Sequence, residues 1–77
     1  MEFNRIEINP KVCAGKPVIK GTRIPVSIII EQIANGESWD SIIKGYPELT
    51  KADIKAALFY AKSSIEHTDL IPVALAG

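Results

Sequence analysis

The chain has 77 residues, of which 47% are apolar, and its nine basic side chains balance nine acidic ones. This length fits a single domain with a small core, and because small domains commonly gain stability by association, we expect a homodimer. A formal net charge of zero argues against a protein that holds nucleic acid by electrostatics alone. The single cysteine, Cys13, excludes an internal disulfide bond and a cysteine-rich metal site.

The first residues and the hydropathy of the chain bear on its location. Residues 1–5 lack the basic-then-apolar pattern of a secretory signal, and no apolar run approaches the length that spans a bilayer. We therefore expect a cytoplasmic protein with no membrane contact. The charges are unevenly distributed: residues 1–25 hold five basic and two acidic side chains, a net +3, whereas residues 26–77 hold four basic and seven acidic ones, a net −3.

Residues 1–25 predict an arm of short β-strands. The alternation over residues 6–8 is typical of a strand, and Asn9-Pro10 ends it. Residues 18–19 and 22–24 are two further extended segments, and Lys20-Gly21 between them predicts a tight reversal in which the glycine takes a positive φ. The prolines that bound these segments lack an N–H for the ladder, so the strands must be short or lie at an edge.

The arm carries basic side chains with more than one interpretation. Lys20 is a candidate contact for an anionic partner such as a DNA phosphate. Arg23 lies between two residues that we expect to pack, so we favour a structural clamp, in which its guanidinium bridges carboxylates or carbonyls, over contact with phosphate. Gly21 and Pro25 complete the residues of the arm to which we assign structural roles.

Residues 26–67 predict a bundle of three helices. Apolar residues at helical spacing indicate a first helix over residues 26–34, which Asn35-Gly36 ends. Ser38 is the expected N-cap of a second helix of about two turns. Its apolar residues begin with Trp39, which we assign to the core as a structural residue, although tryptophan is also common in binding hot spots.

A third, longer helix is predicted to follow Thr50, its expected N-cap, with Asp53 interacting favourably with the first turn. Phe59 and Tyr60 supply more aromatic surface than one side of this helix needs, so we expect one of them to face a partner chain. The apolar residues at helical spacing, which form the predicted core stripe, are Ile54, Ala57, Leu58, Ala61 and Ile65.

The order of a helix, an Asn-Gly turn, a short helix, a turn and a longer helix is typical of a trihelical helix-turn-helix domain, whose last helix can enter a DNA major groove. In that case Thr50 is placed to contact a phosphate, and Lys51 and Lys55 are placed for phosphates or guanines. A solvated helix face is the alternative interpretation. The connection over residues 45–49 is also longer than the tight turn of strict helix-turn-helix units.

Catalysis is not predicted. His67 and Cys13 are the residues that an enzyme would need, and neither has a base, nucleophile or metal-ligand partner at a recognisable spacing. Asp40 and Asp53 lie at predicted helix starts and are better explained by the helix dipole than by acid–base chemistry. We therefore expect no enzyme activity, no metal and no cofactor.

Three stretches of the sequence carry a resemblance to a known family. They are residues 8–26, which include Gly-Thr-Arg-Ile-Pro, residues 33–36, and residues 46–50 with Asp53-Ile54. The match covers about residues 6–62 and closely resembles the small bacterial and archaeal proteins called domain of unknown function 433. The resemblance implies a winged-helix-like or homeodomain-like trihelical fold, often dimeric, and an antitoxin role beside a small PIN-like ribonuclease toxin.

Together these observations predict a mostly α-helical chain with short β-strands. One domain covers residues 1–67, with the β arm over residues 1–25 and the helix bundle over residues 26–67. An apolar C-terminal tail over residues 68–77 follows it.

The leading hypothesis is the antitoxin of a type II toxin–antitoxin pair, a non-enzymatic protein that dimerises, binds its own operator DNA and sequesters the toxin. In the tail, Ile71, Val73 and Leu75 are candidates for partner contact, because an apolar segment of this kind needs a docking surface. The alternative is a homodimeric adaptor that binds no nucleic acid and whose arms exchange strands between protomers.

Overall fold

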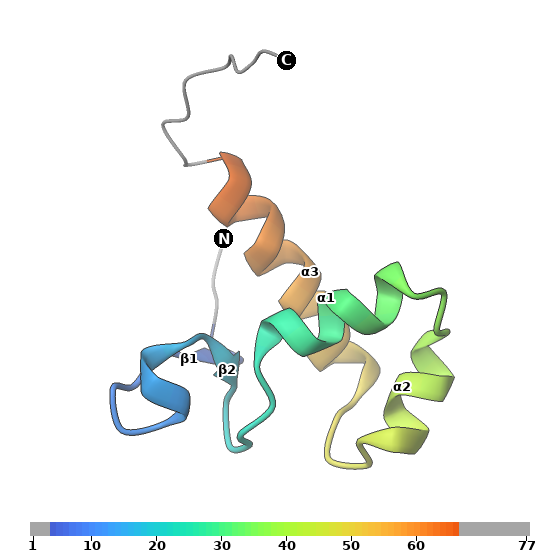
Figure 1. The fold of residues 1–77 in the computed structure, drawn as a ribbon, viewed down its shortest axis with the longest axis horizontal. Coiled ribbons are helices and arrows are strands. Elements are labelled where there is room, and N and C mark those ends of the chain that lie inside the picture. The colour runs from blue at the N-terminus through green and yellow to red at the C-terminus, as the bar shows by residue number, and fades with distance from the viewer. Residues whose placement is uncertain (1–3, 67–77) are drawn as a thin grey trace.

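The two strands of the arm pair with each other. In the computed structural model, which describes residues 4–66, β1 (Ile6–Glu7) and β2 (Val18–Ile19) form an antiparallel sheet in which Ile6 lies opposite Ile19 (Figure 1). The connection between the strands contains a short 3-10 segment, η1 (Cys13–Gly15). The result is the small N-terminal β-hairpin, ahead of three helices, that the sequence predicts.

β2 also has a neighbour on its other side. We expected residues 18–19 and 22–24 to flank a tight reversal, and the pairing across it is short: an isolated bridge joins Val18 to Pro25, and Ile19 donates to the carbonyl of Ile24. Because Pro25 has no N–H to donate and the first helix begins at the next residue, the ladder cannot extend on this side. The second strand therefore pairs with β1 along one side and with the segment after the turn through a single bridge on the other.

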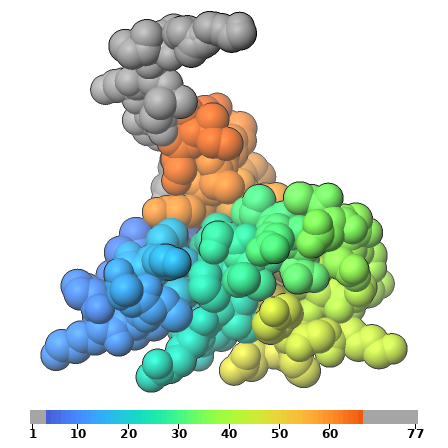
Figure 2. All heavy atoms as spheres, viewed as in Figure 1, coloured from blue at the N-terminus to red at the C-terminus, as the bar shows by residue number. Residues whose placement is uncertain are grey.

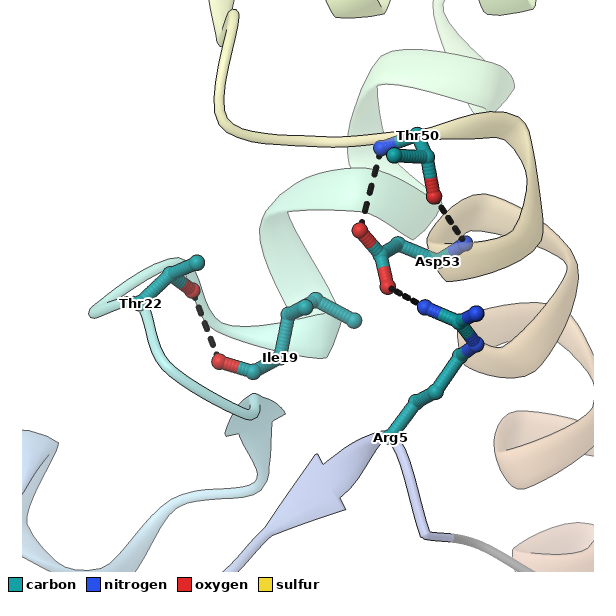
Figure 3. A network of polar contacts seen from close by, with 5 residues as sticks. All are labelled: Arg5, Ile19, Thr22, Thr50 and Asp53. Carbon is teal, nitrogen blue, oxygen red and sulfur yellow. Dashed lines mark hydrogen bonds and ion pairs between the residues drawn. The ribbon is translucent and has the colours of Figure 1, made fainter.

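The reversal after β2 is nevertheless closely hydrogen-bonded. Gly21 has a φ of +82°, the positive value that the sequence predicts there. Thr22 donates from both its N–H and its Oγ1 to the carbonyl of Ile19, at 3.0 and 2.8 Å (Figure 3). Its Oγ1 also accepts from the N–H of Ile24 at 3.0 Å, and Ile19 donates to the carbonyl of Ile24 at 3.0 Å. The turn is thus held by its own side chain as well as by its backbone.

Three helices follow the arm. They are α1 (Val26–Ala34), α2 (Trp39–Gly45) and α3 (Lys51–Glu66) (Figure 1). After α1, Gly36 has a φ of +88°, which ends the helix. Before α2, the Ser38 Oγ accepts from the N–H of Ser41 at 3.0 Å, so it is the N-cap that the sequence predicts.

The core is shared between the arm and the bundle. Because β2, the turn after it and all three helices contribute buried side chains, the arm is an integral part of the packed domain. In α3 the buried residues, Asp53, Ile54 and Ala57, all lie in the first half of the helix, and the second half extends beyond the other helices (Figures 1 and 2). The buried apolar residues are Val18, Ile19, Ile24, Val26, Ile29, Ile42, Leu49, Ile54 and Ala57.

One buried carboxylate connects the start of α3 to the arm. Asp53 is 7% exposed, and its Oδ2 accepts from the N–H of Thr50 at 3.0 Å while its own N–H donates to the Thr50 Oγ1 at 3.2 Å. These two bonds form a reciprocal capping box. The other carboxylate oxygen, Oδ1, accepts from the Arg5 Nη1 at 2.9 Å (Figure 3). The Arg5 carbonyl in turn accepts from the N–H of Lys20 at 2.7 Å, just after β2.

The conformation of Gly21 leads to a stability prediction. A Cβ built at Gly21 meets nothing within 4 Å, so a Gly21→Ala substitution introduces backbone strain without a clash. We expect it to lower the free energy of unfolding by about 1 kcal/mol, the cost of placing an L-residue in the left-handed region. Urea denaturation followed by circular dichroism measures this.

Gly45 provides the matched control. It ends α2, has no positive φ, and also has open space around a built Cβ. Gly45→Ala should therefore leave the stability unchanged or raise it by about 0.5 kcal/mol, because it restricts the unfolded chain. Equal effects of the two substitutions would contradict the role assigned to the φ of Gly21.

The Asp53 network leads to a second prediction. Asp53→Ala removes both the capping bond and the ion pair, and we expect a loss of about 2 kcal/mol of unfolding free energy, roughly 1 for each. Arg5→Ala keeps the capping box and should cost about 1 kcal/mol or less, since the Arg5 side chain is 50% exposed. Chemical denaturation of both variants measures the two losses of unfolding free energy. Equal losses for Arg5→Ala and Asp53→Ala would contradict the prediction.

Candidate protein-binding surface

The middle of α3 and the start of α2 line a hollow, which we call the aromatic hollow. It is lined by Trp39, Lys55, Leu58, Phe59 and Lys62. The four α3 residues share one face of the helix because they are spaced by three or four positions. The Ser38 cap starts α2 at Trp39, which joins the lining from this second helix. Phe59 is 39% exposed, so the hollow presents a large apolar side chain to solvent.

A second hollow lies on another face of α3, against the start of α1, and we call it the α1–α3 groove. Ile65, at 73% exposure, is its most exposed apolar side chain. Glu31 is the single charged residue of the lining. The groove is lined by Pro17, Val26, Ser27, Ile30, Glu31, Tyr60, Ala61, Ser64 and Ile65.

The two aromatic neighbours of α3 therefore belong to different surfaces. Phe59 lines the aromatic hollow, whereas Tyr60 is half-buried, packs against the core and lines the α1–α3 groove. Trp39 is also half-buried and packs against the core, so it has both the structural position that we assigned and a place at the surface. The sequence predicts a partner for one of the two α3 aromatics, and Phe59 is the more exposed.

A third hollow lies beside the turn after β2, where Arg23 is found. We expected Arg23 to be partly buried and paired, but it is exposed and its guanidinium forms no ion pair with any residue in 4–66. Because Thr22 and Ile24 on either side point inward, the side chain between them points out. The structural clamp is Arg5 instead, on Asp53. The hollow is lined by Glu7, Val12, Gly21, Thr22, Arg23, Ile24, Tyr46 and Glu48.

The residues predicted to contact DNA are only partly brought together. Thr50, Lys51 and Lys55 all lie exposed at the start of α3, while Lys20 lies on the turn after β2. The Thr50 N–H and Oγ1 are occupied by the capping box, and the Lys51 Nζ lies 3.6 Å from the Asp40 Oδ1. Lys55 is instead part of the aromatic hollow.

Sequence reasoning missed one member of the aromatic hollow. We assigned Lys62 no binding role from the sequence, and its Nζ bonds the Glu66 Oε2 at 2.7 Å. The structure also places it at the wall of the hollow. The spacing of Lys55, Phe59 and Lys62, at positions i, i+4 and i+7, was the available signal.

The other residues singled out in the sequence either line none of these hollows or lie outside the described residues. The Cys13 thiol lies 3.5 Å from the carbonyl of Arg23, at hydrogen-bond distance for sulfur. His67 and the tail residues Ile71, Val73 and Leu75 lie outside the described residues. Among the residues that are described, no group of three His, Cys, Asp or Glu side chains is placed to hold a metal ion. No helix in this part of the chain is both long and apolar enough to cross a membrane.

Comparison with known proteins assigns the chain to a family. Residues 6–61 match the family described as "Protein of unknown function (DUF433)". An uncharacterized protein, y4eO of Sinorhizobium fredii, is 32% identical over 56 residues, which are 73% of this chain and a quarter of that relative's length. The crystal structure of a DUF433 member protein from Anabaena variabilis matches 82% of this chain and 62% of its own, with a TM-score of 0.77 and 36% identity. The chain therefore belongs to the DUF433 family, as its sequence resemblance implied.

Proposed function

We propose that this chain is a non-enzymatic antitoxin, a small protein that binds and neutralises a PIN-like ribonuclease toxin. The observation that supports the proposal is the apolar surface that α3 leaves uncovered, with Phe59 39% and Ile65 73% exposed on different faces of one helix. Large apolar side chains that are exposed in a hollow often mark a surface that binds another protein. The choice of a PIN-like ribonuclease as the proposed partner rests on the family resemblance.

The aromatic hollow is the proposed toxin contact. Aromatic anchors in partly buried pockets dominate the energy of protein interfaces. Trp39 and Phe59 provide such anchors, and the core packing of Trp39 holds one wall in place before a partner arrives. A preformed wall lowers the entropy cost of binding.

The α1–α3 groove is the proposed homodimer contact. A two-fold interface requires a surface that is complementary to itself. The groove meets this requirement because it combines a projecting side chain, Ile65, with a hollow beside Ile30 and Tyr60 into which the partner's copy of that side chain can pack. The rival function, a homodimeric adaptor that binds neither toxin nor DNA, uses the same groove.

Operator binding is the remaining part of the proposal. The order of α2, a loop and α3 supports it, together with the exposed Lys51 and Lys55 on the first two turns of α3. Asp40 lies beside Lys51, so this end of α3 carries both signs of charge. We therefore expect weak, strongly salt-dependent binding.

The toxin interaction is tested by recovering the partner. The tagged chain is expressed at native level in its own host and purified after nuclease treatment, and mass spectrometry then identifies what accompanies it. We expect a PIN-like ribonuclease in near-equal amount, and we expect the purified chain to inhibit its ribonuclease activity. Phe59→Ala should weaken the affinity, measured by calorimetry, about ten-fold or more, as truncation of an interface anchor does.

Lys11→Ala is the matched control, since Lys11 is exposed on the arm and lines none of the three hollows. It should leave the affinity unchanged. Recovery of the chain alone, as a dimer by light scattering, would contradict the antitoxin proposal and favour the adaptor.

Operator binding is tested through its salt dependence. The probe is a duplex from the region upstream of the chain's own gene, titrated between 50 and 200 mM salt. The slope of log K against log salt is negative. Replacing both Lys51 and Lys55 by Ala should make it less steep by about 2, roughly 0.9 for each phosphate that the protein no longer neutralises. The paired substitution of Lys11 and Lys44 removes the same charge elsewhere. Equal slopes for the two double variants, or no binding at 50 mM, would exclude this role for α3.

A further inference from the structure

We infer that the occupant of the aromatic hollow is an acidic amphipathic helix of the partner protein, with two carboxylates about two turns apart and apolar side chains between them. The inference deepens the proposed function, because it names the chemistry of the segment that binds at the proposed contact. It does not require the partner to be a toxin, since it depends only on the side chains that line the hollow.

The apolar part of the lining selects for apolar side chains. Trp39, Leu58 and Phe59 come from two helices that the core holds in place, and Leu58 and Trp39 both pack against that core. A hollow of this kind accepts leucine-sized or aromatic side chains from one face of a helix. A wholly polar segment would leave this surface wet and would gain little from binding.

The lysines at the walls select for negative charge at a defined spacing. Lys55 and Lys62 are seven residues apart on α3, which corresponds to a rise of about 10 Å. Among residues 4–66, Lys55 forms no ion pair, and Lys62 forms one with the exposed Glu66 in the next turn. A partner helix that lies along α3 therefore meets both cations if its acidic residues are also about seven apart.

A protein segment fits this hollow better than a nucleic acid strand. Bases can stack on Trp39 and Phe59, but a strand also needs a continuous basic track for its phosphates. Residues 26–77 carry a net charge of −3 from four basic and seven acidic side chains, and Glu66 lies beside Lys62. The lining holds two separate lysines, with Glu66 beside one of them, and this arrangement favours isolated carboxylates over a polyanion.

The single tryptophan of the chain makes the inference directly measurable, because Trp39 is in the hollow. The probe is a tryptophan-free 14-residue helical peptide with Glu at positions 3 and 10 and Leu or Phe at positions 6 and 7. Its twin has Lys in place of both Glu residues. We expect the acidic peptide to shift the Trp39 emission saturably and to bind about ten-fold more tightly than its twin.

Charge reversal in the protein completes the test. Lys55→Glu with Lys62→Glu should reverse the preference, so that the Lys twin binds more tightly than the acidic peptide. Lys55→Glu alone keeps the Lys62–Glu66 bond and should remove most of the preference. This single variant keeps the test valid if the double variant does not fold. Lys11→Glu with Lys16→Glu is the matched control, since both lysines are exposed on the arm, and it should leave the preference unchanged.

Three results would overturn the inference. They are equal binding of the two peptides, equal weakening by the control variant, and displacement of the peptide by a dT oligonucleotide, which would indicate a nucleic acid site. A shift of Trp39 emission on deleting residues 68–77, without added peptide, would instead assign the hollow to the chain's own tail. The proposed antitoxin function fails separately, if no PIN-like ribonuclease accompanies a chain that still prefers the acidic peptide.

Discussion

The fold depends on the placement of a single buried carboxylate, that of Asp53. Its two oxygens hold residues that are far apart in sequence: the N–H of Thr50, which starts α3, and the guanidinium of Arg5, which precedes β1. Burial makes the carboxylate costly unless both oxygens are satisfied, so each of its two partners stabilises the position of the arm against the start of α3. Arg5 then transmits the constraint to β2, because its carbonyl accepts from Lys20.

This constraint fixes α3 at one end, and the other end remains exposed. Asp53, Ile54 and Ala57 anchor the first half of the helix in the core, whereas Phe59 and Ile65 in the second half stay exposed. A helix that continues in one piece from an anchored half to an exposed half presents its side chains in a fixed geometry. The same helix can then offer two surfaces, because neighbouring residues such as Phe59 and Tyr60 point about 100° apart.

The sequence predicts the helices well because their ends are marked locally. Ser38 and Thr50 cap the helices that follow them, and apolar spacing shows which side is buried. The pairing of the arm is harder, since two-residue strands carry almost no periodicity and β2 had two candidate partners. Which arginine acts as the clamp depends on a contact between residues 5 and 53, and such a contact leaves no local pattern. The aromatic hollow was missed for the same reason, because Trp39 joins it from another helix.

The net charge of zero conceals a separation that matters for binding. The arm and the rest of the chain carry +3 and −3, yet Arg5 with Asp53 is the one ion pair that joins them among residues 4–66. The remaining arm cations, Lys11, Lys16, Lys20 and Arg23, are exposed and form no ion pair in this part of the chain. Composition argues against a chain that is basic throughout, but it does not exclude a local basic surface. Because these cations and the aromatic hollow share no residue, an anionic partner at the arm and a protein partner at α3 need not compete for the same side chains.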